Sequence, residues 1–182
     1  MRLKRLFFLI LYYGLARYLP ASNVPWSFGS GKLRRLCARN LFKECGKNIN
    51  IERGAYFGSG RFIEIGNNSG IGINCHVPND IIIGNDVMMG PNCFFLERLT
   101  HNFDQIDIPV REQGLSQVPK RTIIGNDVWI GRQVLFMAGK CIGNHTIIGA
   151  GSVVSKDIPE YVVAVGNPIR VIRDRREITN KK

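Results

Sequence analysis

The sequence lacks a hydrophobic segment long enough to span a membrane. Residues 6–16 form an uncharged, mostly apolar run of eleven residues between Arg5 and Arg17, whereas a membrane-spanning helix needs about 20. A signal peptide is an alternative on charge and length, but no clear small-x-small cleavage site follows the run. We therefore expect a cytoplasmic protein, with a peripheral position on the inner face of the plasma membrane as a second option.

Histidine and cysteine are scarce and scattered, which argues against a metal centre or a disulfide framework. The five cysteines include no CxxC pair and favour reduced thiols in a cytosolic compartment. The three histidines, His76, His101 and His145, lack the spacing of zinc ligands. We therefore expect no metal ion.

Positive charge is concentrated near the N-terminus. The formal net charge is +11, and residues 1–45 hold nine lysines and arginines but a single acidic residue, Glu44. No zinc-finger, RNP or helix-turn-helix signature accompanies this charge, so we expect no nucleic-acid partner. Anionic lipid or a phosphorylated ligand fits the charge better.

Residues 1–45 predict a basic, apolar helical segment ahead of a second domain at residues 46–182. Seven apolar residues fall on one helical face; they are Leu3, Leu6, Phe7, Ile10, Leu11, Leu15 and Leu19. This helix either packs on protein, its own chain or an oligomer partner, or lies in a membrane interface, where aromatic residues flanked by Arg and Lys are favoured. The apolar spacing in residues 33–41 predicts a second short helix, with Gly46 as its C-cap.

A six-residue repeat fills most of the second domain. Apolar residues recur every six positions in two blocks; they are Ile65, Ile71, Val77, Ile83, Met89 and Phe95, then Ile124, Ile130, Phe136, Ile142, Ile148 and Val154. A helix would repeat at 3.6 residues and a half-buried strand at two. Period six instead indicates short strands joined by tight turns in which Gly or Asn permits the conformation. Three hexads would close one triangular coil, and stacked coils would share one core. Cys75 and Cys93, three hexads apart, should stack in that core.

The pattern [LIV]-Gly-x-x-[small]-x resembles the bacterial transferase hexapeptide repeat, over about residues 47–165. The resemblance implies an all-β fold, the left-handed parallel β-helix, which is an exception to the usual right-handed crossover. It also implies an acyltransferase that uses acetyl-CoA as co-substrate. Residues 47–64 depart from strict register, and Lys140 stands where a small inward residue is usual.

The repeat breaks after Thr100 and resumes near Val118, so residues 101–117 should form a protruding loop. Its first residue, His101, is the best candidate for a general base, because the ordinary histidine pKa lies near neutrality and an alcohol attacks only as its proton is removed. Thr100-His101 also stands where galactoside and maltose O-acetyltransferases, which this stretch resembles, carry their base. Asp104 is a candidate to orient His101, and the alternative is an exposed loop carboxylate.

The C-terminal part resembles the closing coil and tail of these enzymes, over residues 149–159 and 164–173. The resemblance implies that Ala150 lets the pantetheine arm lie against the coil. It also implies that one hydroxyl and three cations hold the phosphates and nucleotide of CoA; they are Ser155, Lys156, Arg170 and Arg173. Cations suit CoA because arginine grips phosphate through two parallel hydrogen bonds. The alternative is a solvated basic tail.

Two further groups complete the predicted site. The stretch Trp129-Ile130-Gly131-Arg132 resembles the family segment in which a backbone N–H stabilises the thioester oxyanion, and the N–H would be that of Arg132. The family often has serine there, so the role of the Arg132 side chain stays open. Asn74 and Asn92 are candidates for contacts with the acceptor, although asparagines in repeat turns usually serve the turn alone.

The predicted function is O-acetyl transfer from acetyl-CoA to a hydroxyl of a sugar or polysaccharide precursor, by direct attack within a ternary complex. Residues 15–20 and 43–51 also resemble polysaccharide-cluster acetyltransferases, and a lipid-linked acceptor is one option. The alternatives are an antibiotic or amino-sugar acetyltransferase and a non-catalytic β-helix scaffold. The resemblance further implies a homotrimer in which His101 of one chain faces Trp129, Arg132 and Ala150 of another.

Overall fold

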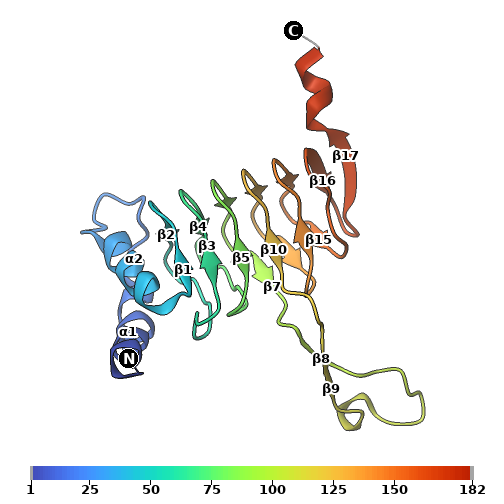
Figure 1. The fold of residues 1–182 in the computed structure, drawn as a ribbon, viewed down its shortest axis with the longest axis horizontal. Helices are drawn as coiled ribbons and strands as arrows, with labels where there is room; N and C mark the ends of the chain where they lie inside the picture. Colours follow the sequence, from blue (N-terminus) through green and yellow to red (C-terminus); the bar gives the residue numbers. More distant parts are fainter. Residues whose placement is uncertain (1, 181–182) are drawn as a thin grey trace.

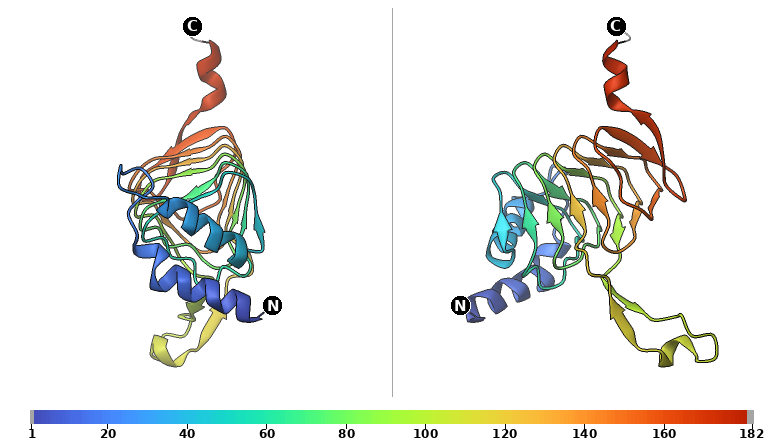
Figure 2. Two further views of the ribbon diagram at one scale, coloured as in Figure 1. Left: turned by 90° about the vertical axis from the view of Figure 1, so that its left-hand side faces the viewer. Right: turned by 45° about the vertical axis from the view of Figure 1, so that its right-hand side comes forward.

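The structure is a computed structural model and describes residues 2–180. Short parallel strands wind into a triangular prism, a β-solenoid of about six turns with helices at its N-terminal end (Figure 1). Seen end-on, the coils superpose as a triangle, and α2 (Ser30–Leu41) lies across the open end (Figure 2). The predicted parallel β-helix is confirmed. No helix in the described residues is long and apolar enough to cross a bilayer.

Three faces make up the prism, which we name A, B and C. Face A holds β1 (Glu44–Cys45), β3 (Glu64–Ile65), β5 (Ile82–Ile83), β10 (Ile123–Ile124) and β13 (Cys141–Ile142). Face B holds β2 (Asn50–Ile51), β4 (Gly70–Ile71), β6 (Met88–Met89), β11 (Trp129–Ile130), β14 (Ile147–Ile148), β16 (Val162–Val165) and the antiparallel β17 (Arg170–Asp174). Face C holds β7 (Phe94–Phe95), β12 (Leu135–Phe136) and β15 (Val153–Val154), preceded by bridges from Tyr56 to His76 and on to Phe94. A short 3-10 segment, η3 (Arg175–Asn180), follows β17.

The strand register follows the predicted period. Ile65 pairs with Ile83, and Ile124 pairs with Ile142, so each partner lies one coil of three hexads further along the chain. The first coil is longer, since hydrogen-bonded neighbours there are 20 residues apart, as Lys47 and Asn67 are, instead of 18, as Asn126 and Asn144 are. These two extra residues explain the irregular register of residues 47–64.

Inward-pointing apolar residues stack into one continuous core. Phe95 and Phe136 lie in successive coils with parallel rings 4.0 Å apart, and both are buried. Cys75 and Cys93 are also buried in successive coils, and the Cys93 N–H donates a hydrogen bond to the Cys75 sulfur over 3.3 Å. Their predicted role as stacked core residues is confirmed. Lys140, the exception to the repeat, is half-buried beside a surface groove instead of entering the core.

The N-terminal helices close one end of the prism. The helix α1 (Arg2–Gly14), the 3-10 segment η1 (Ala16–Tyr18) and α2 contribute Tyr12, Ala16, Cys37 and Leu41 to the same buried cluster as the first coils. The Tyr12 hydroxyl donates to the Ala55 carbonyl over 2.8 Å. The predicted helices therefore exist, and they share a core with the β-helix; the domain boundary at residue 45 stays a prediction.

The second helix ends earlier than Gly46, so the predicted C-cap is wrong. α2 ends at Leu41, and Phe42 leaves it in an extended conformation. Gly46 instead lies in the first coil, where a Cβ would come within 2.4 Å of the Gly66 backbone. The glycine is thus required by the close stacking of coils.

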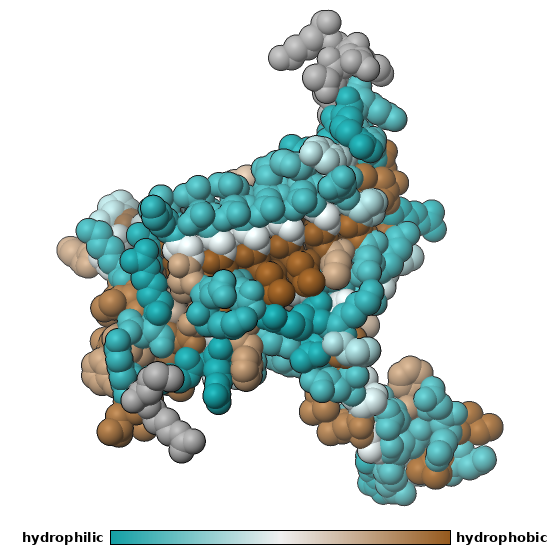
Figure 3. All heavy atoms as spheres, viewed as in Figure 1, coloured by the Kyte–Doolittle hydropathy of each residue, from teal (hydrophilic) through white to brown (hydrophobic). Residues whose placement is uncertain are grey.

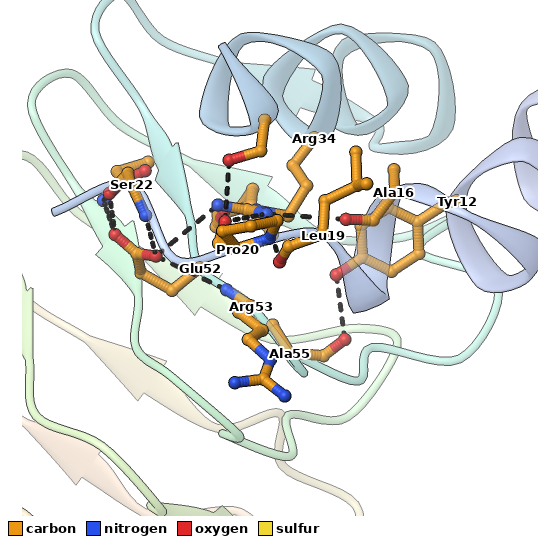
Figure 4. A network of polar contacts seen from close by, with 12 residues as sticks. Tyr12, Ala16, Leu19, Pro20, Ser22, Arg34, Glu52, Arg53 and Ala55 are labelled. Carbon is orange, nitrogen blue, oxygen red and sulfur yellow. Dashed lines mark hydrogen bonds and ion pairs between the residues drawn. The ribbon is translucent and has the colours of Figure 1, made fainter. Parts of the chain in front are cut away.

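An arginine inside the N-terminal end ties the helices to the first coil. The Arg34 side chain is fully buried, and its Nε donates to the Ile51 carbonyl over 2.6 Å. Its Nη1 donates to the Pro20 carbonyl over 3.0 Å and the Leu19 carbonyl over 3.3 Å, and its Nη2 lies 3.6 Å from a carboxylate oxygen of Glu52 (Figure 4). Buried charges need such partners. Arg34 therefore holds the α1–α2 connection against β2.

Candidate active site

The predicted loop is a hairpin that leaves the prism between faces C and A. β8 (Leu99–His101) pairs antiparallel with β9 (Leu115–Gln117), and η2 (Val110–Glu112) lies near its tip. The Val118 N–H donates to the Arg98 carbonyl over 2.8 Å at the root of the hairpin, and the Arg98 side chain returns a hydrogen bond to the Val118 carbonyl. The hairpin projects away from the coils (Figure 1). Its root is thus fixed to the scaffold while its tip is clear of it.

His101 lies opposite Leu115 in this hairpin and is exposed. No hydrogen bond or ion pair reaches its imidazole from the residues that the structure describes. Asp104 is exposed as well, and no contact within residues 2–180 joins it to His101. The structure therefore leaves the imidazole available to a ligand, and the orienting role of Asp104 stays a prediction.

A groove of about 570 Å³ runs along the corner between faces C and A, beside the hairpin root. Thr100, the neighbour of His101, lines it together with Ser155, Lys140 and Glu97. Ser155 and Lys156 directly follow β15, so they share this corner with the hairpin root. The structure thus places the predicted base and part of the predicted CoA site along one edge, the C–A corner.

The corner between faces B and C holds the other predicted groups. Arg132 follows β11 and Ala150 follows β14, and the Gly151 N–H donates to the Arg132 carbonyl over 2.9 Å. Asn74 and Asn92 lie in lower coils of the same corner, with φ of 52° and 59°. A positive φ explains why asparagine stands at these turns. Trp129 points outward from the adjoining face and is about half exposed.

Close coil stacking at the B–C corner brings the exposed Arg132 backbone next to Ala150. A Cβ added to Gly131 would come within 2.5 Å of the Ala150 N atom, so the coils can stack this closely because residue 131 is glycine. The Arg132 N–H has no hydrogen-bond acceptor among the residues that the structure describes. Arg132 is exposed, and its N–H lies beside the exposed Ala150, whose N–H also has no acceptor among the described residues. The position suits a donor for an oxyanion.

Three predicted cations remain exposed and unpaired. Lys156, Arg170 and Arg173 are exposed, and no ion pair is formed by any of them within residues 2–180. Arg170 and Arg173 lie on β17, which pairs with β16 at the C-terminal end of face B. Cations without internal partners are free to bind an external anion such as a phosphate.

Taken together, most of the predicted residues fall into two groups on one chain. His101, Ser155 and Lys156 belong to the C–A corner, whereas Trp129, Arg132, Ala150, Asn74 and Asn92 belong to the B–C corner and the adjoining strand of face B. Face C lies between the two corners. A single chain therefore does not bring its predicted base to its predicted oxyanion donor.

Sequence reasoning missed two groups beside these corners. Glu97 lines the C–A groove, and desolvation together with the Asp80 carboxylate raises the pKa of its carboxyl. Arg17 lines a pocket on face C with aromatic side chains. The repeat pattern carries no signal for such contacts, which depend on how the loop and the N-terminal segment pack on the coils.

His145 lies apart from both groups, at the third corner of the prism. Its Nδ1 is 2.9 Å from Asp127, and its ring stacks on Tyr161.

Comparisons with known proteins identify the family of the chain. The family model described as bacterial transferase hexapeptide (six repeats) matches residues 62–96 and 121–156. The galactoside O-acetyltransferase of Escherichia coli K12 is 37% identical over 144 residues, which cover 78% of this chain and 68% of the relative. The chain belongs to the hexapeptide-repeat acetyltransferase family, and the predicted fold family and enzyme class are confirmed at that level.

Two further comparisons extend the match. The galactoside O-acetyltransferase of Lactococcus lactis is 37% identical over 74% of this chain, and the match spans 64% of that relative's own length. A solved galactoside acetyltransferase in complex with coenzyme A superposes with a TM-score of 0.77 and 32% identity, over 98% of this chain and 84% of that one. The related structure thus binds coenzyme A, the carrier part of the predicted co-substrate.

Proposed function

We propose that this protein transfers the acetyl group of acetyl-CoA to a hydroxyl of a sugar or polysaccharide precursor. The observation that carries the proposal is the pair of corners, one with an exposed histidine and the other with an unpaired backbone N–H beside a small residue. The family membership supports the chemistry. Turnover of acetyl-CoA with a panel of sugar acceptors tests it; a chain that neither binds nor consumes acetyl-CoA would be the non-catalytic scaffold. Faster turnover with an amino sugar or an antibiotic would favour the alternative acceptors.

The residues divide the reaction between them. His101 accepts the proton of the acceptor hydroxyl as its oxygen attacks the thioester carbonyl carbon. The Arg132 N–H donates a hydrogen bond to the carbonyl oxygen as negative charge develops there. The carbon–sulfur bond then breaks, the protonated His101 gives its proton to the departing sulfur, and CoA leaves as the thiol while the acceptor oxygen keeps the acetyl group. Asp104 is proposed to orient His101 during these steps, and Asn74 and Asn92 to contact the acceptor.

The active form is proposed to be a homotrimer. Because the two corners lie on either side of face C in one chain, the site is complete only where the C–A corner of one subunit meets the B–C corner of the next. A triangular prism with projecting hairpins suits packing about a three-fold axis. A mass above that of the monomer in light scattering supports this assembly, and a monomer mass at assay concentration contradicts it.

Replacing Lys156 or Arg170 with alanine is expected to raise the KM for acetyl-CoA. Each cation would bind a phosphate of CoA, and a hydrogen bond to a charged group contributes about 1.5–3 kcal/mol, so the increase should be about 10-fold or more. Steady-state kinetics with both substrates varied measure it. Arg61→Ala, which removes an exposed cation near the opposite end, is the control. A change confined to the KM of the sugar would show that Lys156 and Arg170 do not bind CoA.

The N-terminal helix is proposed to contact an anionic membrane surface. α1 packs Leu11 and Tyr12 against the protein and leaves Leu3, Phe7 and Ile10 at least 60% exposed. Apolar residues gather at this end of the surface (Figure 3), beside the cluster of lysines and arginines in residues 1–45. An apolar face with basic flanks suits the membrane interface.

Phe7→Glu and Ile10→Glu are expected to weaken binding to vesicles that contain anionic lipid. An apolar side chain of this size contributes on the order of 1 kcal/mol when partly inserted, so each change should lower partitioning about fivefold or more. Sedimentation with anionic and with neutral vesicles measures it, and Ile172→Glu, an exposed apolar residue on β17, is the matched control. Equal binding of all three variants would reject the membrane contact, and a lower oligomer mass would identify a subunit interface instead.

A further inference from the structure

A second pocket lies on face C near the helical end of the prism. Its volume is about 360 Å³, and Arg17, Tyr56, Asn74, His76 and Phe94 are among its lining residues. Arg17 comes from η1, whereas the others come from successive coils. None of the described residues that line it is acidic. The N-terminal segment therefore supplies the positive charge of a pocket whose floor is the β-helix.

The floor is a ladder of aromatic rings. Tyr56, His76 and Phe94 are bridged in parallel across three coils, and both successive ring pairs have centroids 4.5 Å apart and nearly perpendicular planes. Tyr56 and Phe94 are about 40% exposed. Burial and the Arg17 charge lower the pKa of His76, so its ring is neutral at neutral pH. Exposed aromatic rings in a row offer flat, partly apolar surfaces of the kind against which the C–H face of a pyranose packs.

Arg17 is held firmly over this floor. Its Nε donates to the Gly54 carbonyl over 3.1 Å, and the Gly54 N–H donates back to the Arg17 carbonyl over 2.9 Å. The guanidinium lies 5.6 Å from the centre of the Tyr56 ring and 5.9 Å from that of Tyr13. Its two terminal nitrogens have no hydrogen-bond or ion-pair partner in the part of the chain that the structure describes. The guanidinium therefore presents free N–H donors in a fixed, planar arrangement, which matches the oxygens of a carboxylate or a phosphate.

The pocket lies between the two corners that the chain contributes to the proposed active sites. Phe94 lines both this pocket and the groove beside the hairpin root. Asn74 lines it from the B–C corner, the corner that also carries Arg132. A sugar bound over the aromatic floor and beneath Arg17 therefore lies next to residues of both corners.

We propose that this pocket is an acceptor subsite for a sugar that carries an acidic group, either a carboxylate or a phosphate ester. Arg17 binds the oxyanion, and the sugar ring packs against Tyr56 and Phe94. The inference rests on the proposed sugar O-acetyltransferase activity and narrows its acceptor to an anionic glycan. It also gives the N-terminal segment a part in substrate selection.

Binding by saturation-transfer NMR tests the subsite without turnover. The probes are a glucuronate-containing disaccharide with its carboxyl-reduced counterpart, and glucose 1-phosphate with glucose. Wild-type protein is expected to prefer the acidic member of at least one pair by about 10-fold or more, as a charged hydrogen bond allows, and the pair preferred identifies the oxyanion. Arg17→Gln should abolish that preference, Arg17→Lys should retain part of it, and Arg53→Gln, which changes an exposed arginine outside the pocket, should keep it.

The outcomes separate this inference from the proposed function. A wild-type preference that survives in Arg17→Gln, or the absence of binding by both acidic probes at millimolar concentration, overturns the subsite. Anionic binding that depends on Arg17 in a protein without acetyl transfer upholds the subsite and rejects the activity. Unchanged affinity of Arg17→Gln for CoA shows that the variant is folded.

Discussion

His101→Ala is expected to lower kcat by about 10²- to 10⁴-fold, the usual contribution of general-base assistance. The affinity for CoA should stay unchanged, because His101 projects on the hairpin and has no partner among the described residues that its loss would disturb. Steady-state turnover and a separate CoA binding measurement check the two parts. His145→Ala is the matched control, since His145 lies at the third corner against Asp127. Activity of His101→Ala within a few-fold of wild type would remove this residue from the mechanism.

Subunit mixing tests whether the base acts on a neighbour's corner. Ala150→Leu should block the B–C corner where the pantetheine arm is proposed to lie. In trimers that mix His101→Ala with Ala150→Leu chains, some sites would combine an intact histidine from one chain with an intact corner from the next. Activity should therefore reappear on mixing. Mixing His101→Ala chains with chains that carry both changes should restore nothing, and failure of the first mixture despite proven subunit exchange would contradict a shared site.

Arg34→Met is expected to lower the free energy of unfolding by about 3–5 kcal/mol, the usual cost of breaking a buried ion pair. The change leaves the Ile51 and Pro20 carbonyls without their donor and Glu52 without its cation. Urea unfolding at one fixed protein concentration measures it. Arg39→Met, an exposed change on the same helix, should stay within about 0.5 kcal/mol of wild type. A similar small loss in Arg34→Met would show that the network contributes little.

The same network gives this stability a pH dependence. Burial opposes ionisation of Glu52, but hydrogen bonds from Ser22 and Asn50 and the charge of Arg34 outweigh it, so the pKa of Glu52 is lowered. A lowered carboxyl pKa stabilises the folded state above the unfolded value of about 4.3, and the contribution is lost as pH falls through the folded pKa. Wild-type protein should therefore lose more stability between neutral pH and pH of about 3 than Arg34→Met does.

The periodic part of the molecule was predictable because its contacts repeat. Ile65 lies over Ile83 for the same reason that Ile124 lies over Ile142, so the spacing alone gives the register. Arg34 was not predictable in this way. It stands among other cations on a helix, and its burial depends on carbonyls of residues 19, 20 and 51, which no local pattern joins to it.

The candidate site was predictable residue by residue but not as an arrangement. The loop and tail motifs indicated His101 and Lys156, and the repeat indicated Arg132. The corner at which each residue lies depends on its position within its coil. Arg17 reaches the B–C side only because η1 packs on Gly54. Such contacts are set by tertiary packing of non-periodic segments, which sequence spacing does not encode.

The hairpin interrupts the chain without interrupting the scaffold. Ile83 and Ile124 are adjacent in the sheet, and Phe95 and Phe136 stack in the core, as if the residues between the coils were absent. An insertion or deletion in this segment would thus alter few contacts that support the fold. The part of the hairpin beyond His101 can therefore change in length and sequence at little cost in stability, while the proposed base, the prism and its corners stay in place.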